Sequence, residues 1–280
     1  MRNGTRAAGV GGAVRLLVLL ATMATGTGLF SADSVIRRVD GEGVLLLGGG
    51  RALLMQLAHP AVAQGVADHS GFEADPFARL RGTLNAMTTI VYGTTDQAAR
   101  MATDVKSIHR RVRGEGYYAN DPALLLWVHA TLVDTALRMH ERFLRPLSER
   151  DARQFYDESK VLAEVLGVPM RAQPDDLDDF RTYVRDTVGS LEVSDAGRRL
   201  ARQVFHPQVP WFVGPVTEPV MRLAQQVTVG LLPRPLREGF GFSWDARRKA
   251  ALLMVGAAAR QVLPRMPAVL RRVPMVNVAA

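Results

Sequence analysis

The sequence predicts an all-α fold, organised as one domain of many helices. Helix-start signals recur along the chain, and segments of alternating polarity are nearly absent. Ala, Leu, Val and Arg dominate the composition, while only 6% of the residues are aromatic. With ordinary helix and loop lengths, the 280 residues should form about nine to eleven helices.

The expected helix starts are marked by capping residues, two of them in front of proline. Asp75-Pro76 and Asp121-Pro122 each place a carboxylate before a proline at the first helical position. Serines, a proline and glycines mark the later boundaries by the same capping preferences. These further boundaries are, in chain order, Ser148, Gly167, Pro174, Gly189, Ser194 and Ser243.

The composition excludes several classes of site and partner. Without cysteine the chain cannot form disulfides, zinc fingers, iron–sulfur clusters, thiolate-ligated haem or covalently attached haem. The net charge of +8 would suit nucleic acid, but the arginines are spread over every segment, often beside carboxylates. We therefore expect no nucleic-acid partner. The charge also fits peripheral contact with acidic lipid headgroups.

The N-terminal segment is expected to be separate from the folded domain. We assign residues 1–29 to an apolar helix and residues 30–280 to the helical domain. The uncharged run from Leu16 to Ala32 falls short of the roughly 20 apolar residues that span a bilayer. A helix that packs on the domain or lies on a membrane is favoured, with a cleaved signal peptide as the alternative. The expected location is therefore cytoplasmic or membrane-associated, with secretion as the alternative.

The motifs of several enzyme classes are missing from the sequence. It contains no Glu-x-x-His pair of the di-iron type, no His-Glu-x-x-His and no serine nucleophile elbow. GVLLLGGG, residues 43–50, is the one candidate strand, but no Lys-Ser or Lys-Thr follows its glycines, so nucleotide binding is not expected there. His140, among charged residues, is expected to be exposed, and His206 to lie at a helix end.

VKSIHRRVRG, residues 105–114, places a histidine within an apolar stripe. On a helix, Val105, Ile108 and Val112 share one face, and His109 lies among them. A core histidine that binds a carbonyl or a water explains this pattern, and so does a metal ligand. The cations that share another face of the segment are Lys106, Arg110 and Arg113.

A cation and a hydroxyl are expected together on the helix that follows Asp75-Pro76. Arg79 and Thr83 are one helical turn apart, and Met87 and Ile90 continue the same face as an apolar wall. Such a pair would suit the polarisation of a small ligand such as dioxygen on a metal. A surface arginine over a hidden threonine is the alternative.

Two more histidines lie in apolar segments. His59 precedes Pro60, which is expected to bend or start a helix there. His129 lies in a segment that is apolar nearly all round, so its helix is expected to be buried. A buried imidazole needs a partner, which would be a hydrogen bond that supports the site or a metal.

Five sequence blocks in a fixed order resemble a known family. They are R-A-L-L-x-Q-L-A-H-P-x-V-A, D-H-S-x-F, D-P-x-x-R-x-x-x-T, V-x-x-I-H-x-x-V-x-G and D-P-x-L-L-x-W-V-H-A-T-L. They are similar to the family that unites the rubber oxygenase (latex-clearing protein) catalytic domain with the MpaB-type oxygenases. The resemblance runs from Phe30 to Arg260. It implies an all-α, globin-like core that holds a non-covalent b-type haem.

The resemblance also implies roles for individual residues. VKSIHRRVR aligns with the family's Val-x-x-Met-His-Ala-x-Val-Arg block, which assigns the proximal iron ligand to His109. The family's distal Arg-x-x-x-Thr pair falls on Arg79 and Thr83. This chain has Gly82 where the rubber oxygenases have a distal lysine, and their distal glutamate has only Glu73 as a candidate match. Both departures weaken the expectation of polyisoprene cleavage, but they do not affect the expectation of haem binding.

Together these features predict a haem-dependent oxygenase that acts with dioxygen on an apolar, isoprenoid or lipid-like substrate, with an unidentified redox partner. His109 would bind the iron of haem b, and His129 and His59 would contribute to the cofactor site. Arg110 and Arg113 would pair with the haem propionates.

Two alternatives remain open. The first is a haem or lipid carrier without turnover, because the distal base is unaccounted for. The second is a non-haem iron or zinc site built from His59 and His69 with Asp68 or Glu73.

Overall fold

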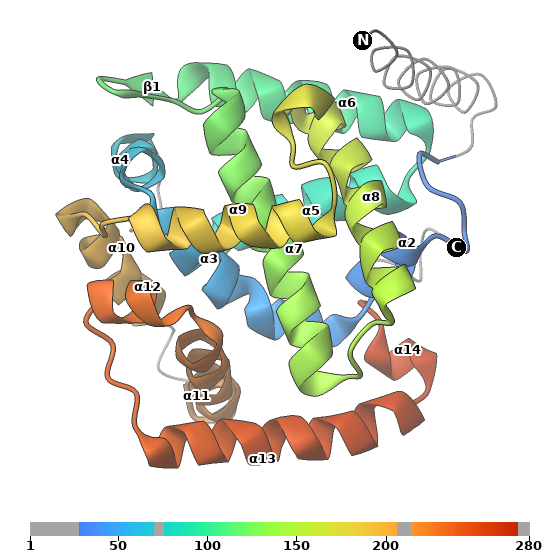
Figure 1. The fold of residues 1–280 in the computed structure, drawn as a ribbon, viewed down its shortest axis with the longest axis vertical. Coiled ribbons are helices and arrows are strands. Elements are labelled where there is room, and N and C mark those ends of the chain that lie inside the picture. Colours follow the sequence, from blue (N-terminus) through green and yellow to red (C-terminus); the bar gives the residue numbers. More distant parts are fainter. Residues whose placement is uncertain (1–27, 70–75, 206–213, 274–280) are drawn as a thin grey trace, which may run out of the picture.

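The computed structural model describes residues 28–69, 76–205 and 214–273 (Figure 1). For residues 76–80 and 214–217 it describes the backbone alone. The predicted all-α fold is confirmed. Within the described residues, the strands are β1 (Arg113–Gly114) and β2 (Tyr117–Tyr118), which pair antiparallel.

The helices follow one another with short connections. The first half of the chain contains α2 (Val35–Asp40), α3 (Gly49–Ala58), α4 (Pro60–His69), α5 (Pro76–Tyr92), α6 (Thr95–Arg111) and α7 (Pro122–Phe143). The second half contains α8 (Glu149–Leu166), α9 (Leu177–Ser190), α10 (Asp195–Phe205), α11 (Gly214–Leu231), α12 (Arg234–Gly239), α13 (Ala246–Val262) and α14 (Ala268–Arg271). The 3₁₀ helices are η1 (Gly43–Gly48), η3 (Met170–Ala172) and η4 (Leu263–Arg265).

The described residues thus contain more helices than the sequence predicted. The excess comes from α2 and α12, which have six residues each, and α14, which has four. Helices this short leave no clear periodicity in a sequence, because they complete fewer than two turns.

Capping hydrogen bonds confirm four of the predicted helix boundaries, which are Asp121, Ser148, Gly167 and Ser194. Asp75 lies outside the described residues. The Asp121 carboxylate accepts from the Ala123 amide at 2.8 Å, and the Ser148 hydroxyl accepts from the Asp151 amide at 3.0 Å. Gly167 ends α8 in the left-handed conformation, with φ of 114°.

The start of α13 differs from the prediction. Asp245 caps this helix instead of Ser243, and its carboxylate accepts from the Arg248 amide at 2.8 Å. Ser243 accepts from the Arg248 guanidinium instead. The two candidate caps are two residues apart, so the sequence alone could not separate them.

Residues 43–50, the one candidate strand in the sequence, form η1 and the start of α3 instead. The glycines of this segment allow helices to approach closely. A Cβ atom on Gly48 would lie 2.7 Å from a methyl carbon of Thr135, and one on Gly50 would lie 2.4 Å from the Thr228 hydroxyl. Helix packing, rather than phosphate binding, accounts for this glycine run.

α7 runs through the middle of the molecule and packs on α3, α8, α9 and α13 (Figure 1). Trp127 on α7 is 1% exposed, and its indole nitrogen donates to the Met55 carbonyl of α3 at 3.1 Å. A buried ion pair between Arg51 of α3 and Asp134 of α7 lies further along the same interface, at 2.6 Å. Apolar packing and a polar link therefore both hold α7 in place.

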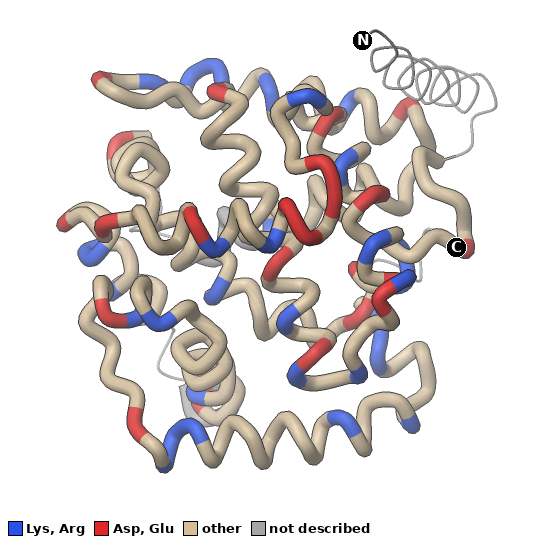
Figure 2. Tube along the Cα trace, viewed as in Figure 1, with Lys and Arg blue, Asp and Glu red and all other residues tan. Residues whose placement is uncertain are grey.

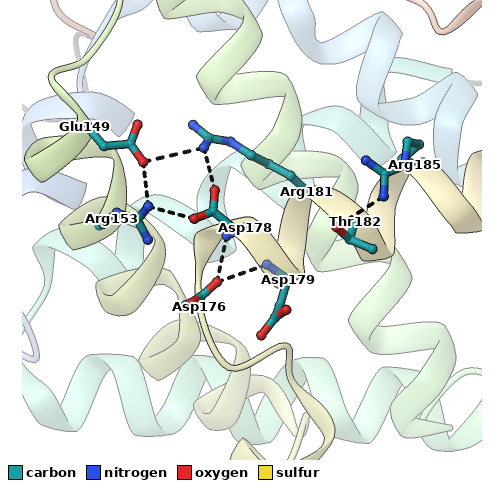
Figure 3. A network of polar contacts seen from close by, with 8 residues as sticks. All are labelled: Glu149, Arg153, Asp176, Asp178, Asp179, Arg181, Thr182 and Arg185. Atoms are coloured by element: carbon teal, nitrogen blue, oxygen red, sulfur yellow. Dashed lines mark hydrogen bonds and ion pairs between the residues drawn. The ribbon is translucent and has the colours of Figure 1, made fainter.

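The outer side of α8 is joined to α9 by a network of charged residues (Figure 3). Arg153 on α8 contacts Glu149 at 2.9 Å and reaches Asp178 on α9 at 2.7 Å. Arg181 on α9 contacts the same Asp178 at 3.0 Å. These side chains are about half exposed, so the network orients α9 but is open to screening by salt.

Among the described helices, none combines the length and the apolar character needed to cross a bilayer.

Candidate functional site

α5 and α6 form a helical hairpin that carries the predicted site residues. The two helices are separated by Gly93 and Thr94 and pack extensively on one another. Thr94 starts α6 with a capping box, in which its hydroxyl accepts from the Gln97 amide and the Gln97 side chain accepts from the Thr94 amide. This tight turn fixes the register of the two helices.

The hairpin brings Arg79 and His109 to the same end. Both lie roughly 22 Å from the turn, at 1.5 Å per residue, and Thr83 lies about one helical turn closer to it. The Arg79 side chain lies outside the described part of the structure, so its distal role remains a prediction. Thr83 is half-buried.

His109 lies on the inner face of α6, as predicted, but Ile108 does not. Ala98 and Ala102 are buried, and Val105 and His109 are half-buried one and two turns further along the same face. Ile108 is 61% exposed. The predicted stripe is therefore wrong at Ile108, because the inner face of α6 passes through residue 109.

The predicted propionate-binding arginines lie at the exposed end of α6. Arg110 is in the last turn of the helix, and Arg113 is in β1, just beyond it. Both are exposed, and neither forms an ion pair with another described residue. Lys106 differs from them, because it is half-buried and packs near Gly167 at the end of α8. Arg110 and Arg113 are thus accessible to an anion, whereas Lys106 is only partly exposed.

His59 presents an unused ring nitrogen inside the protein. It ends α3 and is followed by Pro60, which starts α4 as predicted. Its Nδ1 atom is buried and has no hydrogen-bond partner among the described residues. Burial lowers the pKa of His59, and the carboxylate of Asp121 partly opposes this effect. His59 is therefore a neutral imidazole with one nitrogen available.

His129 is buried, as predicted, and faces α8. It is 6% exposed, and neither of its ring nitrogens makes a hydrogen bond within the described part of the chain. Burial lowers the pKa of His129 to about 4. The backbone of Ser159 lies nearby and partly opposes this lowering, although its contact with the ring is not a hydrogen bond. The ring is thus neutral and buried.

His69 and His140 are placed differently. His69 is exposed, and its Nε2 atom lies 3.1 Å from the carbonyl oxygen of Arg113, which fastens α4 to the hairpin of β1 and β2. His140 is 7% exposed, so the prediction of an exposed side chain is wrong. It packs beside Val39 at the end of α2, and burial lowers its pKa to about 4. His206 lies outside the described residues.

The described residues contain no group of three His, Asp or Glu side chains placed to hold a metal ion. In particular, Asp68 accepts a hydrogen bond from the Tyr117 hydroxyl at 2.7 Å. Glu73 lies outside the described residues.

An apolar cavity of about 130 Å³ lies between η1, α3, α5 and α7. Thr83 and Met87 of α5 form part of its wall, as the sequence predicted for one face of this helix. Ile90, which was expected to continue that wall, is instead fully buried in the core. Leu46 of η1 and Val273 also line the cavity. The cavity therefore joins a predicted site residue to an apolar space.

Asp40 is a carboxyl group on the cavity wall that the sequence did not indicate. It ends α2, accepts no hydrogen bond and makes no ion pair with the described residues. Burial raises the pKa of Asp40 to about 7. Tyr92, also on the wall, donates to the Arg37 carbonyl at 2.6 Å, and burial and the charge of Asp40 raise the pKa of Tyr92. Near neutral pH the cavity therefore holds a carboxyl that can gain or lose a proton beside a protonated phenol.

Comparison with known proteins identifies relatives of this chain. The family profile described as "ER-bound oxygenase mpaB/B'/Rubber oxygenase, catalytic domain" matches residues 36–262. Two uncharacterized proteins, from Mycobacterium bovis and Mycobacterium tuberculosis, are each 30% identical over 225 residues, which cover 76% of this chain and 87% of theirs. No solved structure matches. The chain therefore belongs to the family of MpaB and rubber oxygenase catalytic domains.

Proposed function

We propose that the protein is a haem-dependent oxygenase that acts with dioxygen on an apolar, isoprenoid or lipid-like substrate. The proposal is carried by His109, which stands in the family's histidine block and lies on the inner face of α6, at the end of the hairpin where Arg79 lies. The family is named for oxygenases, which supports the reaction class. The apolar cavity beside Thr83 supports the substrate class.

The donor groups of this chain fit a b-type haem. The chain has no cysteine, and iron in such a haem binds imidazole in its neutral form. In the proposal His109 holds the iron, and His59 and His129, which burial keeps neutral, contribute to the surroundings of the cofactor. Arg110 and Arg113 would pair with the propionates. The bound haem would supply the activation of dioxygen.

The chain's own polar groups would act on charge and protons. Arg79 stays charged at any working pH and can donate hydrogen bonds to an oxygen atom that gains negative charge. The Thr83 hydroxyl can orient the same group or donate a proton to it through water. Asp40, on the cavity wall with Thr83, can hold or release a proton near neutral pH.

The size of the cavity suits part of a substrate and not the porphyrin. Pockets for drug-sized ligands typically measure roughly 300–1,000 Å³, and this one measures about 130 Å³. An apolar cavity of about 150 Å³ in another protein takes up benzene or xenon. The reacting segment of a chain-like lipid fits that scale.

Oxygen uptake tests the proposal. The haem-loaded protein is given isoprenoid and fatty-acid emulsions, with and without an electron donor, because insertion of a single oxygen atom also requires reduction of the other. Arg79→Ala should keep its haem and lose about 10²–10³ in rate, since it removes a donor from a water-poor site. Thr83→Val should lose less. Arg100→Ala, an exposed arginine on the same hairpin, is the matched control and should keep full activity.

Two outcomes would contradict the proposal. If Arg79→Ala empties the protein of haem or unfolds it, Arg79 anchors a propionate or the fold, and the distal assignment is wrong. If the haem-loaded protein consumes no oxygen with any apolar substrate in either condition, the carrier function replaces the oxygenase.

A further inference from the structure

α13 is an apolar helix with only one covered face. It lies along the lower edge of the molecule in Figure 1 and packs on α7 and α11. Leu252 and Gly256 are its buried residues. Ten consecutive residues of α13, from Ala250 to Ala259, carry no charge. On the side away from the core, Met254 is 67% exposed. A helix that is apolar all round is normally covered all round.

The exposed apolar residues continue into the next helix. Val269 and Leu270 on α14 are 67% and 68% exposed. Large apolar patches on a protein surface mark sites of interaction, whereas single exposed apolar residues do not. We call this surface the α13–α14 face. Its exposed apolar residues are Leu253, Met254, Val255, Val262, Val269 and Leu270.

The charges on α13, η4 and α14 themselves are all positive, and two neighbouring acidic residues, Asp245 and Glu42, each pair with one of these cations. Figure 2 shows α13 without charge along its middle and blue toward its two ends. From Ala246 to Val273 the chain has seven arginines and lysines and no Asp or Glu. Arg248 pairs with Asp245 and Arg271 pairs with Glu42. The other five cations form no ion pair with a described residue, and they are Arg247, Lys249, Arg260, Arg265 and Arg272.

We propose that the α13–α14 face binds the surface of a membrane that contains anionic lipids. Apolar side chains with cations around them are what an interfacial helix presents to lipid acyl chains and headgroups. A second copy of this chain fits less well, because a two-fold contact would place the cations of one face against those of the other. The proposed contact is made by the exposed side chains of α13 and α14.

The α13–α14 face also borders the apolar cavity. Val273, two residues after α14, lines the cavity, and its amide donates to the Gly41 carbonyl at 3.0 Å. Leu46, also on the cavity wall, is 40% exposed. A lipid-like substrate could therefore reach the cavity from a membrane bound at this face. This consequence rests on the proposed function, whereas membrane binding does not.

Sedimentation of the full chain with vesicles tests the proposal. One set of vesicles contains phosphatidylcholine alone, and the other contains phosphatidylcholine mixed with phosphatidylserine. The wild type should sediment with the anionic vesicles and be released by high salt. Met254→Asp should abolish binding, and the double variant Arg247→Gln, Lys249→Gln should weaken it by about fivefold for each cation removed. Val220→Asp, which changes a side chain 58% exposed on α11, is the matched control and should bind as the wild type does.

Circular dichroism and gel filtration of each variant show whether it is folded and monomeric. Binding that survives both Met254→Asp and the double variant would place the membrane contact elsewhere and overturn the proposal. A wild-type dimer that Met254→Asp converts to a monomer would assign the face to a second copy. If the wild type binds neither type of vesicle, the proposal of membrane binding is also overturned. Because none of these readouts involves oxygen uptake, they are independent of the proposed oxygenase activity.

Discussion

Asp40 ends α2 with its carboxyl in the cavity wall, and burial raises its pKa from 3.8 to about 7. The unfolded chain releases this proton near pH 4, whereas the folded protein holds it until about pH 7. The stabilising effect is therefore fully present below pH 4 and is lost as the pH rises to 7. The loss amounts to at most about 4 kcal/mol, and less because Asp40 keeps some accessible surface.

Asp40→Asn should remove this dependence on pH. The variant and the wild type should have similar free energies of unfolding at pH 4, and the variant should be more stable at pH 8. Urea denaturation at both pH values measures the difference. His129 and His140, whose pKa values are lowered to about 4, are present in both proteins, so their contribution cancels. A difference that does not change with pH would show that the Asp40 carboxyl is solvated.

Single residues differ in how far the sequence predicts them. The inner-face position of His109 on α6 could be predicted from the apolar stripe, because the stripe is a local pattern. That of Asp40 could not, because an acidic residue before Gly41 resembles any helix end. Its place in the cavity depends on how η1, α5 and α7 pack around it. His140 was misassigned because charged neighbours in the sequence do not show that α2 packs over its ring.

At the scale of helices, the ion pair between Arg51 and Asp134 should be a main polar link. The Arg51 guanidinium, 2% exposed, also donates to the Thr135 hydroxyl at 2.6 Å and to the Leu231 carbonyl at 2.8 Å. It thereby ties α3 to α7 and α11. Asp134→Asn would leave a buried cation without its counter-charge, which costs about 3–5 kcal/mol, toward the lower end here because two acceptors remain.

Asp178→Asn, in the exposed network of Figure 3, is the comparison for Asp134→Asn. Its effect on the free energy of unfolding should be small and should vanish in high salt, whereas that of Asp134→Asn should persist. Urea denaturation at low and high salt distinguishes the two. If both variants lose the same free energy of unfolding, burial of Arg51 does not strengthen its ion pair with Asp134.

The helices themselves were largely predictable where a cap or a proline marks their start. Asp121-Pro122 and Ser148 are such positions, because the signal is carried by a few adjacent residues. The sequence could not explain the run of glycines at residues 48–50, because its cause is contact with Thr135 and Thr228, far away in the sequence. Long-range packing of this kind leaves no local periodicity.

At the scale of the whole molecule, the chain is a single helical domain that belongs to the family of MpaB and rubber oxygenase catalytic domains. None of the described helices could span a bilayer. The sequence could predict the fold class because helical periodicity and capping are local. It could not predict the cavity or the α13–α14 face, since both depend on which surfaces other helices leave uncovered.

The central claim is that His109 holds a haem. The most direct measurement is the absorption spectrum and pyridine haemochrome content of the purified protein after reconstitution with haemin. The wild type should show a Soret band and close to one haem per chain, and His109→Ala should lose both. His69→Ala, which removes an exposed imidazole at the end of α4, should keep them. A wild type that stays free of haem, or a His109→Ala variant that retains it fully, would contradict the claim.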